Sequence, residues 1–164
     1  MMSTKKTALT GMFACLAFVL STFVCFPSMA PFQHFVNVIA AVILGPWYAF
    51  AAAWICGILR MMGGRTIQAI AGAIFGPVLG GMFYRKTHSI WAAVLGEVVG
   101  TGIIGAVASY PLMTMFYGLT GVKWYYYIPF YLPSAIVGAL MGAIVILMLA
   151  KTGMLKRLQE EINR

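Results

Sequence analysis

Six long apolar segments, separated by short polar or proline-containing stretches, account for almost the whole chain. A helix needs about 20 apolar residues to cross the hydrocarbon core of a bilayer. The pattern therefore predicts an all-α, polytopic membrane protein, a compact bundle of six transmembrane helices that forms one integral membrane domain over residues 1–164. The predicted spans are residues 7–26, 34–45, 47–62, 67–84, 89–110 and 128–150.

Prolines and polar stretches mark the boundaries of these spans. Residues 27–32 form a loop with two prolines after the first span. Pro77 is expected to kink the fourth span, because a proline inside a helix removes one backbone hydrogen bond. Pro111 is expected to end the fifth span, with residues 112–117 continuing as a broken helix or an interfacial piece. The polar tail, residues 151–164, is weakly amphipathic.

The first span also has features of a secretory signal peptide. Lys5 and Lys6 precede it, and Ser28 and Ala30 form a small-residue cleavage pattern. The apolar region of a signal peptide is about 7–15 residues long. Because this run is longer, we expect a first span that is retained.

Composition supports the membrane assignment and excludes other classes. The chain is 62% hydrophobic and only 9% charged, whereas soluble domains carry about 25% charged residues. The net charge of +8 comes from basic residues scattered beside apolar segments, which is typical of orientation signals next to spans and not of a nucleic-acid-binding surface. We therefore expect the lipid bilayer, and no nucleic acid, as a partner.

Three cysteines, Cys15, Cys25 and Cys56, all lie within apolar runs. Their odd number excludes a complete disulfide framework, and they lack the spacing of a metal site. We expect them to be small buried residues.

The distribution of basic residues predicts the orientation. With the N-terminus inside, the inner segments hold eight of the eleven Lys and Arg residues, and only Arg60, Arg65 and Lys123 lie outside. This bias agrees with the positive-inside rule. It predicts cytoplasmic N- and C-termini in a multi-pass protein of a prokaryotic cytoplasmic membrane.

Polar and aromatic residues converge on the predicted outer side. Gln33, His34 and Asn37 open the second span, and buried polar groups in lipid need partners. Arg60, at the end of the third span, is expected either to reach the lipid headgroups or to face the site. The topology predicts a pocket that opens outward below the loops 27–33 and 118–127. Its expected ligand-binding residues are Gln33, His34, Asn37, Arg60, Gln68, Trp124 and Tyr125.

Glu97 is the only acidic residue outside the C-terminal tail. A lone carboxylate in lipid costs about 2.5–3.5 kcal/mol on insertion scales, so it is expected to face the interior, a partner or a ligand. Thr101 lies one turn away on nearly the same face. Two interpretations remain open: both residues form the floor of the pocket, or Glu97 is a buried structural acid. Gly96 and Gly100 allow close approach of another helix.

Small residues form a stripe along the first span. Thr7, Gly11 and Cys15 recur every four residues, with Thr10 and Ala14 alongside. Such a stripe is typical of a helix that docks on another helix. The partner is either another protein or the rest of this chain.

Four segments carry a resemblance to a known family: residues 33–38, 44–49, 83–86 and 93–105. With six predicted spans and an outward pocket, the chain resembles the substrate-binding S components of energy-coupling-factor (ECF) vitamin transporters, most closely the ThiW family. The resemblance covers residues 5–150. The chain departs from the family pattern at the first-helix stripe, where Ala-x-x-x-Ala is usual, and at residues 71–76, where a Pro-Gly-Ser-type entry is expected.

The resemblance implies a binding subunit with no catalysis of its own. Its ligand would be a small neutral heteroaromatic compound, most simply hydroxyethylthiazole, taken up for thiamine synthesis. The implied partners are an ECF transmembrane coupling subunit, on which the first helix docks, and two ATPase subunits that hydrolyse ATP. The loaded subunit would tilt in the membrane. No cofactor is expected in this chain, and its sequence contains no Walker motif.

Two other function classes remain. A stand-alone ion-coupled transporter or channel would use Glu97 as a titrating group and would work without ATP. An intramembrane enzyme would need several convergent carboxylates, histidines or cysteines, and this chain offers little of that kind. Proton-dependent uptake by the isolated chain would distinguish the first alternative from an S component.

Overall fold

The computed structural model describes residues 4–24 and 30–163, and all the regular structure there is helical. The segments α5, η1 and α6 form one continuous helix, Ile90–Tyr117, in which η1 is a π-helical stretch. The elements are α1 (Thr4–Phe23), α2 (Pro31–Leu44), α3 (Pro46–Met62), α4 (Gln68–Thr87), α5 (Ile90–Val99), η1 (Gly100–Gly105), α6 (Ala106–Tyr117), α7 (Ile128–Lys151) and α8 (Met154–Asn163).

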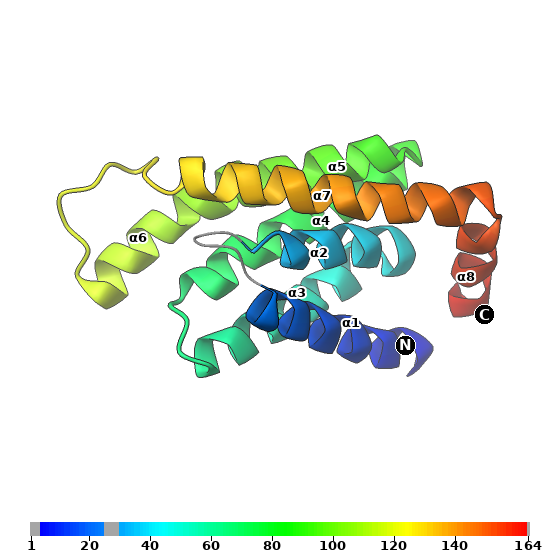
Figure 1. Cartoon of the computed structure of the whole chain (residues 1–164), viewed down its shortest axis with the longest axis horizontal. Helices are drawn as coiled ribbons and strands as arrows, with labels where there is room; N and C mark the ends of the chain where they lie inside the picture. The colour runs from blue at the N-terminus through cyan, green and yellow to red at the C-terminus, as the bar shows by residue number, and fades with distance from the viewer. Residues whose placement is uncertain (1–3, 25–29, 164) are drawn as a thin grey trace.

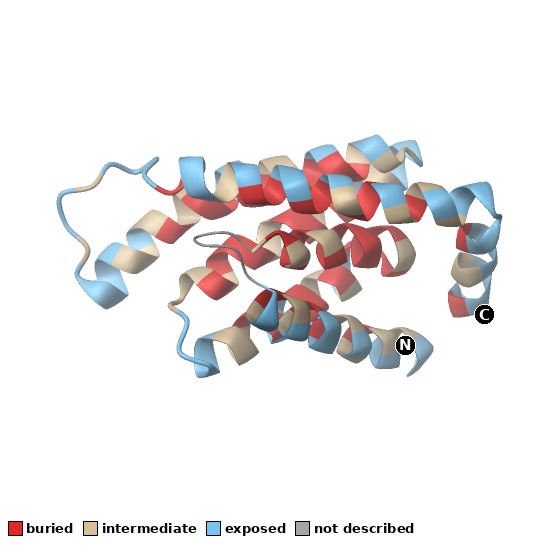
Figure 2. Cartoon of the chain, viewed as in Figure 1, coloured by how far each residue is buried: buried red, intermediate tan, exposed pale blue. Residues whose placement is uncertain are grey.

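The long helices run roughly along one direction, and α8 crosses the end of the bundle at which both termini lie (Figure 1). The tip of α6 and the loop 118–127 lie at the opposite end, where α6 leans away from α7. Helix α2 is central and contacts α1, α3, α4, α5, α7 and α8. Most of its residues are buried, whereas much of α1, α8 and the tip of α6 is exposed (Figure 2).

The predicted all-α bundle is confirmed, with a helix at each of the six predicted spans. In the described part of the chain, three helices are long and apolar enough to cross a membrane: Thr4–Phe23, Ile90–Tyr117 and Ile128–Lys151. The predicted end of the fifth span was wrong, because the helix continues through Pro111 to Tyr117. A proline removes one N–H donor, and a membrane helix tolerates this where neighbouring groups compensate. The tail contributes one more helix, α8.

Two prolines and one glycine explain where α2 and α3 begin and why the chain turns between them. Pro31 and Pro46 occupy the first turns of α2 and α3, where a proline loses no hydrogen bond. Gly45 joins the helices with φ +89°, a conformation that favours glycine. A short turn therefore reverses the chain at the end that carries the termini.

Helices α4 and α5–η1 approach each other through glycines, as the glycine spacing predicted. A Cβ atom added to Gly100 would lie 2.7 Å from the Cα atom of Gly76, and one added to Gly80 would lie 2.9 Å from the Ala93 carbonyl oxygen. Such separations leave no room for side chains. The glycines therefore bring the two backbones into direct contact beside Glu97.

Helix α8 packs across the end of the bundle and is held there by hydrogen bonds. Its Leu155 and Ile162 side chains are buried, and Gln159 Nε2 donates to the Val42 carbonyl oxygen at 2.9 Å. Lys6 Nζ, at the start of α1, donates to Asn163 Oδ1 at 2.7 Å. The N-terminal helix and the C-terminal helix are thus joined on one side of the molecule.

The two described cysteines differ in how far they are buried. Cys56 is buried, as predicted, but Cys15 is exposed on α1, which corrects its expected burial. A thiol is apolar enough to lie on a lipid-facing helix surface. Cys25 and Ser28, the latter part of the possible cleavage pattern, lie outside the described residues.

Candidate functional site

Glu97 lies at the centre of the bundle with its side chain fully buried, and three donors from two helices converge on its Oε1 atom. His34 Nδ1 lies 3.0 Å away, Asn37 Nδ2 donates at 3.1 Å and Thr101 Oγ1 donates at 3.1 Å. An ionised carboxylate only accepts hydrogen bonds, so opposite it His34 Nδ1 is assigned as the donor, as Asn37 Nδ2 and Thr101 Oγ1 are. His34 and Glu97 form an ion pair when the imidazole is protonated. We call these four residues the Glu97 cluster.

Asn37 also supplies a hydrogen bond that Pro77 cannot make within α4. Pro77 has no N–H, so the carbonyl oxygen four residues earlier, that of Ala73, receives no helical hydrogen bond from it. Asn37 Nδ2 donates to that oxygen at 3.2 Å. The amide therefore connects the proline-containing part of α4 to the Glu97 cluster.

The second carboxylate oxygen of Glu97, Oε2, is buried and has no hydrogen-bond partner. It lies directly against Gly76, because a Cβ atom added there would collide with Oε2 and with Thr101 Oγ1. Gly76 thus provides the space that the carboxylate occupies between α4 and α5.

Gln33 and Arg60 form a second polar group, one turn closer to the end opposite the termini. Arg60, in the last turn of α3, donates through Nη1 to Gln33 Oε1. Arg60 is partly buried and points its guanidinium group toward the Gln33 side chain of α2. Gln33 is 2% exposed, and its Nε2 atom has no partner.

Gln68 begins α4 at the same end of the bundle. Its Oε1 atom accepts a hydrogen bond from Thr66 Oγ1 at 3.2 Å. Its buried Nε2 atom makes no hydrogen bond of ordinary geometry with the described residues, but the amide lies near the Tyr127 hydroxyl. Burial raises the pKa of the Tyr127 hydroxyl above its ordinary value, the neighbouring Tyr126 adds to the shift and the Gln68 amide opposes it. Gln68 therefore lies close to the base of the aromatic loop.

Trp124 and Tyr125 are exposed on the loop 118–127. Their rings meet edge to face with centroids 5.3 Å apart, and Lys123 Nζ lies 5.7 Å from the centre of the Tyr125 ring. The predicted ligand-binding residues thus fall into separate groups: the Glu97 cluster, the Gln33–Arg60 pair, Gln68, and the aromatic loop.

The predicted docking stripe on α1 divides into two faces. Thr10 and Ala14 are buried within this chain, whereas Thr7 and Cys15 are exposed and Gly11 is partly exposed. A Cβ atom added to Gly11 would have no neighbour within 4 Å. The Thr7–Gly11–Cys15 face therefore remains accessible for a partner.

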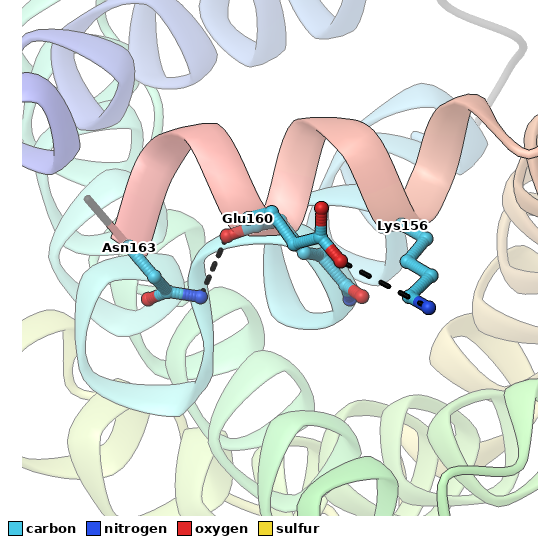
Figure 3. A pocket seen from close by; sticks show the side chains of 4 residues that line it. Lys156, Glu160 and Asn163 are labelled. Atoms are coloured by element: carbon cyan, nitrogen blue, oxygen red, sulfur yellow. Dashed lines mark hydrogen bonds and ion pairs between the residues drawn. The ribbon is translucent and has the colours of Figure 1, made fainter.

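An open depression of about 490 Å³ lies far from these polar groups, on α8 (Figure 3). Its lining residues are Lys156, Gln159, Glu160 and Asn163. Lys156 and Glu160 form an exposed ion pair at 3.9 Å, and Asn163 bonds to the Gln159 carbonyl oxygen. These contacts join residues of one helix, so the depression has the character of a helix surface. Among the described residues, no group of three or more His, Cys, Asp or Glu side chains is placed to hold a metal ion.

A comparison with known protein families shows which family the chain belongs to. Residues 7–152 match the family described as thiamine-precursor transporter protein (ThiW). The chain belongs to the ThiW family. The predicted family resemblance is thereby confirmed, and the membrane-transport character of the protein follows from it.

A solved structure supports the fold of this ThiW protein. The structure of ThiT from Listeria monocytogenes matches with a TM-score of 0.59 and 23% sequence identity, covering 94% of this chain and 96% of that chain. A search of curated proteins found no match.

Sequence reasoning missed two polar contacts of the ThiW bundle. Ser109 Oγ lies 3.1 Å from Tyr131 Oη, where α6 meets α7. The acceptor role of the Ala73 carbonyl oxygen was also missed, although it can be predicted from the position of Pro77 four residues later. Nothing in the local sequence distinguishes Ser109 from other small residues of an apolar run.

Proposed function

We propose that this ThiW protein is the substrate-binding S component of an ECF-type importer and captures a small neutral heteroaromatic precursor of thiamine, most simply hydroxyethylthiazole. The family match supports transport of a thiamine precursor. The observation that carries the binding role is a pair of buried glutamine amides, those of Gln33 and Gln68, whose Nε2 atoms have no hydrogen-bond partner among the described residues. They lie next to the Glu97 cluster, in which Oε1 is hydrogen-bonded and Oε2 is not.

In this proposal, each group has a distinct task. Gln33 and Gln68 bind ring heteroatoms or the hydroxyl group, and Trp124 and Tyr125 cover the face of the ring. The Glu97 cluster forms the floor, with His34 and Asn37 held in place by the carboxylate. A pocket of amides, imidazole and aromatic rings suits a neutral ligand better than a charged one.

The partners and the location follow the same proposal. The chain crosses the cytoplasmic membrane several times, with both termini and α8 inside and the loop 118–127 outside. The exposed Thr7–Gly11–Cys15 face docks on a transmembrane coupling subunit. Two ATPase subunits supply the energy, and this chain performs no catalysis.

Native mass spectrometry of the detergent-extracted chain tests the binding role. We expect one heteroaromatic molecule to co-purify per chain, or added hydroxyethylthiazole to bind at one copy. Replacing His34 and Asn37 together by alanine should abolish retention, because the floor of the pocket is lost. The variant loses buried hydrogen bonds and is expected to be less stable, so its affinity is measured at a temperature where it is still folded; an unchanged affinity there would remove these residues from the site.

A further inference from the structure

The orientation of the Gln33 side-chain amide is determined by its neighbour. A guanidinium group has only N–H donors, so the atom of the Gln33 amide that faces Arg60 Nη1 must be the oxygen. The NH₂ group then points away from Arg60. It is buried, belongs to a residue that is 2% exposed, and has no partner within residues 4–24 and 30–163.

Gln68 lies in the same part of the bundle, but its amide is held less strictly. Its Oε1 atom accepts a hydrogen bond from Thr66, and a hydroxyl, unlike a guanidinium, can meet either end of an amide. A buried donor without an acceptor is costly, and it is kept where something else supplies the acceptor. The Gln33 amide, held by its oxygen, therefore presents its NH₂ group and not its carbonyl oxygen.

Helix register places both amides in one layer of the bundle. Helices α2 and α4 run in the same direction, and Asn37 contacts the Ala73 carbonyl oxygen. One turn earlier on each helix are Gln33 and Ala69, and Ala69 directly follows Gln68. Gly57 of α3 packs on the Ala69 carbonyl oxygen, which brings Arg60 to the same layer.

We propose that Arg60 is a positioning residue that turns the Gln33 amide so that it donates to the ligand, and that the site selects a ring carrying a hydrogen-bond acceptor. This inference rests on the proposed function and adds the polarity of the recognised group. The ring nitrogen of a thiazole is such an acceptor. A ring with C–H at that position leaves the Gln33 donor unpaired and binds more weakly.

The test compares matched probes on the purified full-length chain. Hydroxyethylthiazole, its thiophene isostere and its pyrrole isostere place an acceptor, a C–H group or an N–H donor at one ring position. Calorimetry should show the wild type binding the thiazole at least about tenfold more tightly than the thiophene, the value of one buried hydrogen bond.

Gln33→Glu is the decisive variant. A glutamate has nearly the same shape and still accepts from Arg60, but it has no donor for the ligand. Thiazole affinity should fall at least about tenfold while thiophene affinity stays within about threefold, which abolishes the preference. Equal thermal unfolding of variant and wild type verifies that the fold is kept.

Variants of Arg60 test the positioning role. Arg60→Met releases the amide to rotate, so the thiazole preference should shrink and pyrrole binding should increase. Arg60→Lys should retain the preference, because an ammonium group also only donates. Arg65→Met, at an exposed basic residue of the neighbouring loop, is the matched control and should change none of the affinities.

The outcomes separate this inference from the proposed function. A wild type that binds thiazole and thiophene equally, or a Gln33→Glu variant that keeps the preference, overturns the donor role and leaves the proposed function standing. A wild type that binds none of the three probes overturns the proposed ligand and this inference with it.

Discussion

At the scale of single residues, Glu97 shows how an apolar bundle accommodates a carboxylate. Its Oε1 atom receives donors from His34, Asn37 and Thr101, and Gly76 makes room for Oε2. Burying a charge is tolerated when it is paired and hydrogen-bonded. The cluster therefore stabilises the bundle only while all its members are present.

Substitutions of Glu97 should distinguish charge from hydrogen bonding. Glu97→Ala leaves three buried donors without an acceptor, and we expect a loss of about 3–5 kcal/mol in the free energy of unfolding. Glu97→Gln keeps an acceptor oxygen and should cost less. Thermal unfolding in one detergent measures both, with Glu160→Gln on the surface of α8 as the control, expected within about 0.5 kcal/mol. Equal losses for Ala and Gln would contradict the hydrogen-bonding account.

At the scale of elements, the proline in α4 and the side chain of α2 that replaces its missing hydrogen bond belong together. Pro77 withholds a hydrogen bond from the Ala73 carbonyl oxygen, and Asn37 of α2 supplies one. The glycines of α4 and α5 then bring both backbones against the same cluster. Helix packing and polar chemistry thus depend on the same residues.

A double-mutant cycle tests this link between α2 and α4. Asn37→Ala should destabilise the protein more with Pro77 present than in a Pro77→Ala background, where the restored N–H serves the Ala73 carbonyl oxygen. We expect a coupling of about 0.5–1.5 kcal/mol, the net value of one hydrogen bond. Additive losses in thermal unfolding would show that Asn37 does not compensate for the proline.

The glycine contact gives a separate prediction. Gly76→Ala places a methyl group on Glu97 and Thr101, and such overpacking should cost about 1–3 kcal/mol of stability. Gly11→Ala, where an added Cβ has no neighbour within 4 Å, is the matched control and should gain about 0.5–1 kcal/mol from helix propensity. Denaturation in the same detergent measures the free energy of unfolding of both variants. Equal stabilities would contradict the close contact of Gly76 with Glu97 and Thr101.

At the scale of the whole molecule, the two ends of the bundle differ. One end carries both termini and is closed by α8. The other carries the glutamine amides, Arg60 and the aromatic loop. The accessible face of α1 runs between the two ends, so under the proposed function ligand capture and partner docking would use separate surfaces.

Gly11→Leu tests the docking surface without disturbing the site. The added side chain should leave the fold and ligand binding unchanged, because no described residue lies within 4 Å of a Cβ atom built on Gly11. Co-purification with the coupling subunit should fall at least about tenfold, since a stripe of small residues permits close helix approach. Ala150→Leu, an exposed small residue of α7, is the control; loss of the complex in both variants would show a non-specific effect.

Particular residues show what the sequence could and could not predict. Apolar length predicted the helices, and glycine spacing predicted the contact at Gly100, because both are local properties. The position of Glu97 along its span predicted its depth below the outer polar residues. The sequence did not show which face of α2 is turned toward Glu97, and it is this orientation that brings His34 to the carboxylate. The contact of Arg60 with Gln33 likewise depends on how two helices are turned toward each other.

Transport by reconstituted vesicles tests the central claim that this chain binds a thiamine precursor but has no motor of its own. The account predicts that labelled hydroxyethylthiazole binds at about one copy per chain, and that it accumulates only with the coupling subunit, both ATPases and ATP. Accumulation by the chain alone, driven by a proton gradient and lost in Glu97→Gln, would contradict the account and establish an ion-coupled transporter.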